Sequence, residues 1–166
     1  DLVCPSLGSA APFAVIAGSK VSNAGLSYIT GNLAMSPSIA LTGFSIIPGI
    51  VGYIYGKNEL GTPTALQAQK DVTIAFNECA NAPVTKQMTG MEMAGLTLSP
   101  GVYKWDAAAS LSLPLGILTL NGSGVYIFQI GSALSTSFGS RIILINGATP
   151  GCVFWQVGSS ATLGSQ

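Results

Sequence analysis

The stretch Ile127-Phe-Gln-Ile-Gly-Ser132 decides the fold, because a closely similar stretch, Phe154-Trp-Gln-Val-Gly-Ser159, follows it 27 residues later. Each copy is a short apolar run ending in Gly-Ser, which is typical of a buried strand that leads into a turn. Ile16-Ala-Gly18, followed by Ser19, is a partial third copy near the start. Repetition of short units is typical of structures that stack equivalent coils. The sequence therefore predicts the stacked coils of a solenoid rather than a sandwich.

A hydroxyl-rich segment follows each copy of this repeat. These segments are Ser19-Lys-Val-Ser22, Ala133-Leu-Ser-Thr136 and Ser160-Ala-Thr-Leu163. Successive side chains of a strand point to opposite sides, so we expect Val21, Leu134 and Ala161 to point into the coil. If the three strands stack in register, the intervening side chains form one flat outer face. The residues predicted for this face are Lys20, Ser22, Ala133, Ser135, Ser160 and Thr162.

In one segment the apolar residues recur with the spacing of a helix rather than that of a strand. Thr62 is a suitable N-cap and Pro63 suits the first helical position, so we predict a helix over about residues 63–81. Apolar residues recur there at spacings of three and four: Ala65, Ala68, Val72, Ala75, Phe76 and Cys79. We expect the later members of this stripe, Val72, Ala75, Phe76 and Cys79, to be buried against the sheet.

The composition excludes several classes of function. Charged residues make up 7% of the 166 residues and the formal net charge is zero. A nucleic-acid-binding protein needs a basic surface, so we expect no nucleic-acid partner. The chain has no histidine, which excludes a Ser-His triad and His-ligated zinc, and we expect no metal and no cofactor. No apolar run approaches the roughly 20 residues of a membrane helix, so we expect no membrane insertion.

The three cysteines and one sequon predict covalent features of a secreted protein. Cys152 precedes a strongly apolar strand, so we expect any disulfide to involve it and to join a late coil to an earlier element. Cys79 is the preferred partner and Cys4 is the alternative. Asn121-Gly122-Ser123 is an N-glycosylation sequon in a predicted turn, and it would matter in a protein secreted by a eukaryote.

Several segments, taken in order, resemble the ice-binding-protein-like family of microbial secreted proteins. The resemblance covers essentially the whole chain, and the predicted helix falls where the family has one. The matching segments are Gly8-Ser-Ala-Ala-Pro-Phe-Ala-Val-Ile-Ala-Gly18, Ile29-Thr-Gly-Asn-Leu-Ala-Met-Ser-Pro37, Leu41-Thr-Gly-Phe44, Gly95-Leu-Thr-Leu-Ser-Pro-Gly-Val-Tyr103, Ile127-Phe-Gln-Ile-Gly-Ser132, Ile145-Asn-Gly-Ala148 and Val153-Phe-Trp-Gln-Val-Gly-Ser-Ser-Ala-Thr-Leu163.

This resemblance implies a mainly β fold, an irregular right-handed β-solenoid of triangular cross-section with one long α-helix packed along its side. It implies a single domain over residues 1–166, secretion from the cell, and adsorption to ice crystals that inhibits their growth and recrystallisation. The family's usual ice-binding surface is one flat solenoid face, and the three hydroxyl-rich strands map to it.

Two features depart from the family pattern. Family members continue for several dozen residues beyond the motif that ends near Leu163, so we expect the C-terminal coils usual in the family to be missing. An open solenoid end would expose unpaired strand edges and invite self-association. Lys20 stands where the family more often has Thr or another small residue, and a long, mobile cation should weaken contact with ice.

Two classes of function remain open at this stage. The first is an ice-binding protein without catalysis, and the second is a secreted or cell-surface adhesion module of the same fold that binds polysaccharide or protein. An enzyme would need clustered acids, yet none of the six acidic residues forms a close pair in sequence. Glu59 and Glu92, which flank the predicted helix, are read as solvated loop charges, and we expect no enzymatic activity.

Overall fold

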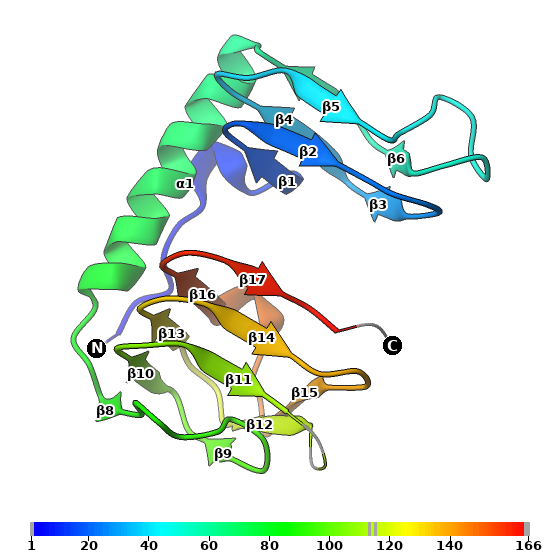
Figure 1. Ribbon diagram of the computed structural model, residues 1–166. Helices are drawn as coiled ribbons and strands as arrows, with labels where there is room; N and C mark the ends of the chain where they lie inside the picture. Colours follow the sequence, from blue (N-terminus) through cyan, green and yellow to red (C-terminus); the bar gives the residue numbers. More distant parts are fainter. Residues whose placement is uncertain (1, 113, 115, 165–166) are drawn as a thin grey trace. The chain divides into compact units, whose positions relative to one another are not determined.

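The computed structural model describes residues 2–112, 114 and 116–164 and contains short strands with one long helix (Figure 1). The chain divides into two compact units. The N-terminal unit is Ser6–Ala75, and the C-terminal unit is Asp1–Pro5 together with Phe76–Gln166. The helix α1 (Pro63–Asn81) contributes residues to both units.

The N-terminal unit contains three small parallel sheets, β1-β4-β7, β2-β5 and β3-β6. Its core is built around Leu33, Met35 and Ile54, whose side chains are buried. Ser9 anchors the short 3₁₀ helix η1 (Gly8–Ala10) by donating from its N–H and its Oγ to Asp71 on α1. The strands of this unit are β1 (Phe13–Ala17), β2 (Lys20–Ser22), β3 (Tyr28–Thr30), β4 (Asn32–Met35), β5 (Ala40–Thr42), β6 (Tyr53–Tyr55) and β7 (Asn58–Leu60).

The C-terminal unit also has three parallel sheets, β8-β10-β13-β16, β9-β12-β15 and β11-β14-β17. Consecutive strands fall in different sheets, so each passage through all three sheets forms one coil. The strands are β8 (Lys86–Gln87), β9 (Thr97–Leu98), β10 (Gly101–Trp105), β11 (Ala109–Leu111), β12 (Ile117–Asn121), β13 (Tyr126–Ile130), β14 (Leu134–Thr136), β15 (Arg141–Ile145), β16 (Val153–Val157) and β17 (Ala161–Thr162), with the 3₁₀ helix η2 (Pro150–Cys152) before β16.

The Gly-Ser at the end of each repeat copy lies where its coil turns, and these turns stack on one another in successive coils. The N–H of Gly131 donates to the carbonyl of Trp105, and the N–H of Gly158 donates to that of Ile130, both at 2.8 Å. A Cβ at Gly131 would collide with the carbonyl oxygen of Asp106, and one at Gly158 would collide with that of Gly131. Glycine is therefore needed where successive coils turn over one another, and this close stacking sets the register of the strands that follow.

The apolar residues of the repeat form the core of the C-terminal unit. Phe128 on β13 lies opposite Trp155 on β16, and their rings stack with centroids 4.1 Å apart. Trp105 on β10 lies on the other side of Phe128, at a centroid distance of 6.4 Å. Burial of these large aromatic side chains contributes much of the stabilisation that a set of short strands needs.

Helix α1 has the predicted bounds, but the prediction for one residue of its apolar stripe was wrong. Ala75 and Cys79 are buried and Val72 is half-buried, whereas Phe76 is 42% exposed. Phe76 follows Ala75 directly and so lies about 100° around the helix from the buried line of small residues. Small side chains suit the buried line because they allow a helix to approach a sheet closely.

Beyond Ala75, α1 covers the outer face of the sheet β8-β10-β13-β16. Cys79 packs with Val102, Val125 and Ile127 in one apolar cluster. Gln129, the glutamine of the first repeat copy, is 4% exposed and donates from Nε2 to the carbonyls of Cys79 (2.7 Å) and Ala82 (2.9 Å). These bonds satisfy carbonyls at the helix C-terminus that have no partner within the helix.

The mainly β solenoid with one helix is thereby confirmed. That residues 1–166 form a single domain stays a prediction. Within the described ranges, no helix combines the length and the apolar character that crossing a membrane requires.

Candidate functional site

The strands β11, β14 and β17 form one sheet of the C-terminal unit (Figure 1). Small hydroxyl side chains lie on its outer face. Ala109 pairs with Leu134 and Leu134 with Ala161, and this row points inward by alternation. Ala109 and Leu134 are buried, whereas Ala161 is exposed and lines an apolar hollow. The next row, Ser110, Ser135 and Thr162, therefore points outward, because neighbouring residues of a strand alternate. Ser135 and Thr162 are exposed, and Ser110 is half-exposed.

A second outward position precedes each of the last two strands. Ala133 comes directly before β14 and Ser160 directly before β17. The N–H of Leu134 donates to the carbonyl of Ser160 at 2.9 Å, which keeps the two chain segments in register at this point. Four of the predicted face residues, Ala133, Ser135, Ser160 and Thr162, therefore lie on one outer surface. We call this surface, with Ser110 included, the hydroxyl face.

Lys20 and Ser22 are not part of this sheet. They lie on β2 in the N-terminal unit, which pairs with β5 in the register Lys20 to Ala40 and Ser22 to Thr42. All four residues are exposed, and Val21 between them is half-buried, as the alternation predicted. β14 pairs with β17 and β2 pairs with β5, so it stays a prediction that Lys20 and Ser22 share one outer face with the other four residues.

Sequence reasoning missed Ser110, Ala40 and Thr42 as members of these outer rows. The signal was present, since Ala109-Ser-Leu111 and Ala40-Leu-Thr42 show the same alternation of small or hydroxyl and apolar residues. The pairing partner could not be read from these short segments, because parallel strands bring together residues that are 20 or more positions apart.

The strands of the hydroxyl face carry no ionisable side chain, and one carboxylate borders them. Glu92 accepts hydrogen bonds from Ser110 Oγ (2.6 Å) and from the N–H groups of Ser112 (2.9 Å) and Ala94 (3.2 Å). Desolvation acts to raise the pKa of Glu92, but these hydrogen bonds outweigh it and hold the pKa below its ordinary value. The carboxylate therefore stays ionised at neutral pH and fixes the loop beside β11.

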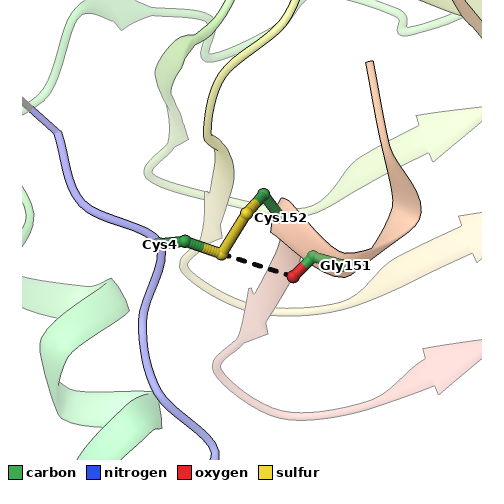
Figure 2. Close-up of a disulfide and its surroundings, with 3 residues drawn as sticks. All are labelled: Cys4, Gly151 and Cys152. Atoms are coloured by element: carbon green, nitrogen blue, oxygen red, sulfur yellow. Dashed lines mark hydrogen bonds between the residues drawn. A yellow bond between two sulfur atoms is a disulfide. The ribbon is translucent and has the colours of Figure 1, made fainter. Parts of the chain in front are cut away.

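The disulfide joins Cys152 to Cys4, so the preferred pairing with Cys79 was wrong (Figure 2). Residues 2–5 belong to the C-terminal unit, which brings Cys4 beside Cys152 across 148 positions of sequence. Figure 2 also shows the carbonyl oxygen of Gly151 close to Cys4 Sγ, at 3.3 Å. Cys79 keeps a free, buried thiol, and burial raises the pKa of that thiol.

Glu59 and Glu92, predicted to be solvated loop charges, both accept hydrogen bonds from neighbouring segments, and Glu59 lies half-buried on β7. Glu59 accepts a hydrogen bond from Thr62 Oγ1 (2.8 Å), and Thr62 caps α1 by accepting from the N–H of Ala65 (3.2 Å). Throughout the described part of the chain, no three His, Cys, Asp or Glu side chains are grouped in a way that could hold a metal ion. Asn121 Oδ1 accepts from Asn146 Nδ2 at 2.8 Å, and glycosylation of Asn121 stays a prediction.

Comparison with known proteins agrees with this architecture. The model of the family described as ice-binding-like matches residues 15–166. The chain belongs to the ice-binding-like family. An ice-binding protein of a Nostoc species is 44% identical over 164 residues, covering 96% of this chain and 57% of that protein. An ice-binding protein of Flavobacterium frigoris is 33% identical, covering 99% of this chain and 62% of that protein.

Solved structures of this family have the same fold. The crystal structure of an ice-binding protein from an Antarctic biological consortium superposes with a TM-score of 0.88 at 36% identity, covering 98% of this chain and 72% of that structure. The ice-binding protein of Antarctomyces psychrotrophicus gives a TM-score of 0.87 at 36% identity, covering 98% and 78%. The chain spans less than two thirds of the length of the ice-binding-like relatives from Nostoc and Flavobacterium.

Proposed function

We propose that this member of the ice-binding-like family adsorbs to ice through the hydroxyl face and thereby inhibits ice growth and recrystallisation. The observation that carries the proposal is the outward row Ser110, Ser135 and Thr162, set on three paired strands without any ionisable side chain. The relatives named as ice-binding proteins, at up to 44% identity, support the same activity.

The geometry of this row suits a crystalline water surface. Neighbouring strands in a sheet are about 4.8 Å apart and alternate residues along a strand about 6.7 Å apart, so the outward groups form a regular array. Short and β-branched side chains lose little conformational entropy when they are held in place. Their hydroxyl groups can hold ordered water, and water-mediated contacts are nearly as favourable as direct hydrogen bonds.

The proposal also gives the protein's mode of action, its partner and its location. A protein that acts by adsorption needs no cofactor and performs no reaction, so its partner is the ice surface and it is not an enzyme. We place the protein outside the cell, where ice forms, and the Cys4–Cys152 disulfide supports this placement because disulfides persist in oxidising compartments.

The shape of ice crystals in a cooled droplet tests the proposal. We expect facetted, growth-arrested crystals with the unmodified chain, and loss of growth arrest with Thr162→Tyr or Ser135→Tyr, because a bulky ring lifts the face away from the lattice. Thr97→Tyr is the matched control, since Thr97 is an exposed threonine on β9 in another sheet. Each variant should unfold as the parent does, because surface changes usually cost no more than about 0.5 kcal/mol.

Each result of this experiment has a distinct meaning. Round, unaltered discs with the unmodified chain would reject ice binding and favour the adhesion module that binds polysaccharide or protein. Full growth arrest by both face variants would reject the hydroxyl face as the surface that contacts ice. Lys20→Thr should leave activity unchanged or raise it, because it removes a mobile cation from the row on β2.

A further inference from the structure

One residue of the hydroxyl face has a hydroxyl proton that is held in a fixed direction. Ser110 Oγ donates to Glu92 Oε2 at 2.6 Å, a short distance typical of a hydroxyl bonded to a carboxylate. The carbonyl of Ser110 also accepts from the N–H of Met93 at 3.0 Å, so the same segment holds the backbone of Ser110. Because its proton points at the carboxylate, the Ser110 oxygen offers only lone pairs to water.

Ser110 differs in this respect from the next residue of the outward row. Ser135 pairs with Ser110 across β11 and β14 and is exposed to solvent. An exposed hydroxyl rotates to suit the water beside it, so its proton can point outward or sideways. A fixed acceptor on β11, at the end of the sheet, therefore orients the first water molecule. Hydrogen bonds from that water extend the same orientation to Ser135, because linked hydrogen bonds polarise one another.

The carboxylate of Glu92 is itself held by the backbone. Glu92 Oε1 accepts from the N–H groups of Ser112 (2.9 Å) and Ala94 (3.2 Å), which leaves Oε2 for Ser110. This arrangement needs two acceptor oxygens. A glutamine amide has one oxygen, so if that oxygen accepts from the two N–H groups, the NH₂ group faces Ser110 and reverses the direction of its hydrogen bond.

The charges around Glu92 are few. Neither β11 nor the rest of the segment 88–94 contains another ionisable side chain. Asp106 contacts this segment at Thr89 and is paired with Lys104 at 3.4 Å. Desolvation acts to raise the pKa of Glu92, the hydrogen bonds to its carboxylate outweigh that effect, and no charge within the described residues contributes. Glu92 therefore takes up a proton only below the ordinary range of a glutamate.

We propose that Glu92 is a positioning residue for ice adsorption: by holding the Ser110 proton it fixes the direction of hydrogen bonding along the hydroxyl face and makes adsorption depend on pH. This inference rests on the proposed function, because it concerns the same face. Glu92 acts through Ser110 rather than by touching ice. When the carboxylate takes up a proton, it donates to Ser110 Oγ, and the serine then turns its own proton outward. Adsorption should therefore weaken as pH falls below about 4.

The lowest protein concentration that arrests ice growth in a cooled droplet at pH 7 tests this role. Glu92→Gln and Ser110→Ala should each raise that concentration about fivefold, which is roughly the effect of one hydrogen bond. The double variant should be no weaker than either single variant, because Glu92 acts only through Ser110. Glu78→Gln is the matched control, since it removes the same charge from an exposed position on α1 and should leave growth arrest unchanged.

The pH profile separates this positioning role from a structural one. Growth arrest by the unmodified chain should weaken between pH 7 and about pH 3, whereas growth arrest by Ser110→Ala should not change over this range. Glu92 keeps its bonds to the N–H groups of Ser112 and Ala94 in Ser110→Ala, so a merely structural role would preserve the pH dependence in that variant. That result, full growth arrest by Glu92→Gln, or additive losses in the double variant overturns the proposal.

The hydroxyl proton of Ser110 gives a readout that needs no ice. In NMR spectra at pH 7 this proton should exchange slowly with water, and Glu92→Gln should make its exchange fast. A freely exchanging Ser110 hydroxyl in the unmodified chain overturns the proposal. Round, unaltered discs with the unmodified chain would overturn the proposed function and the pH dependence together, whereas growth arrest that is the same in Glu92→Gln overturns this inference alone.

Discussion

The two ends of the C-terminal unit are built from the same kind of coil but are finished differently. At one end, which we call the closed end, Met88 and Met93 are buried and the indole N–H of Trp105 donates to the carbonyl of Met91 at 2.8 Å. Glu92 completes this end by bonding to the residues beside β11. At the other end, which consists of β15, β16 and β17 and which we call the open end, Trp155 and its neighbours are only half-buried.

This difference shows that the repeat by itself does not cover the interior of a coil. The repeat supplies inward apolar residues and a glycine corner, which suffice where another coil lies on each side. A coil with a neighbour on one side only needs additional residues that cover its interior and use its edge groups. The closed end has such residues in the segment 88–94, and the open end has none among the described residues.

The largest expected difference between the ends comes from their two tryptophans. Trp105→Ala should lower the free energy of unfolding by about 3–5 kcal/mol, because Trp105 is fully buried. Trp155→Ala should cost clearly less, since one side of Trp155 is uncovered. Urea unfolding measures both values, and equal losses would contradict the distinction between the ends.

The disulfide should provide the next largest effect, because it anchors the N-terminal segment to the last coil. Removing it with Cys4→Ser and Cys152→Ser together should cost about 2–5 kcal/mol, since the bridge constrains a long loop of the unfolded chain. Reduction of the unmodified chain should lower its stability by a similar amount. Cys79→Ala should retain this sensitivity to reductant, and a Cys79→Ala variant that reductant no longer affects would contradict the Cys4–Cys152 pairing.

Phe76 offers a smaller test, because it lines an apolar hollow of about 580 Å³ together with Leu134 and Trp155. Because its side chain is 42% exposed, Phe76→Ala should cost less than about 2 kcal/mol, well below the loss expected for a fully buried phenylalanine. Thermal or urea unfolding gives the value, with Trp105→Ala as the reference for a buried aromatic residue. A loss of 3 kcal/mol or more would mean that Phe76 is covered in solution.

The smallest expected effect concerns pH and the closed end. The pKa of Glu92 is lowered in the folded chain, so its ionised form contributes stability above the unfolded pKa, and this contribution is lost as pH falls through the folded pKa. Glu92→Gln should therefore be less stable than the parent at neutral pH, with a difference that shrinks below about pH 4. A difference that does not change between pH 7 and pH 3 would assign the effect to packing rather than to charge.

Much of this fold could be predicted from local sequence signals. The spacing of apolar residues and the Thr62-Pro63 start predicted α1 with its observed bounds. The alternation in Ala133-Leu-Ser-Thr136 predicted which side chains point outward, because a strand reverses side-chain direction at every residue. The Gly-Ser repeat predicted stacked coils, because identical corners in register require identical residues.

Only the tertiary structure decided the features that depend on the path of the chain between distant segments. The partner of Cys152 depended on where residues 2–5 run, and the sheet of β2 depended on which later strand lies beside it. The exposure of Phe76 depended on which line of the helix meets the sheet. A sequence pattern states what each segment can bury, but burial itself is settled by neighbours that are brought together from far along the chain.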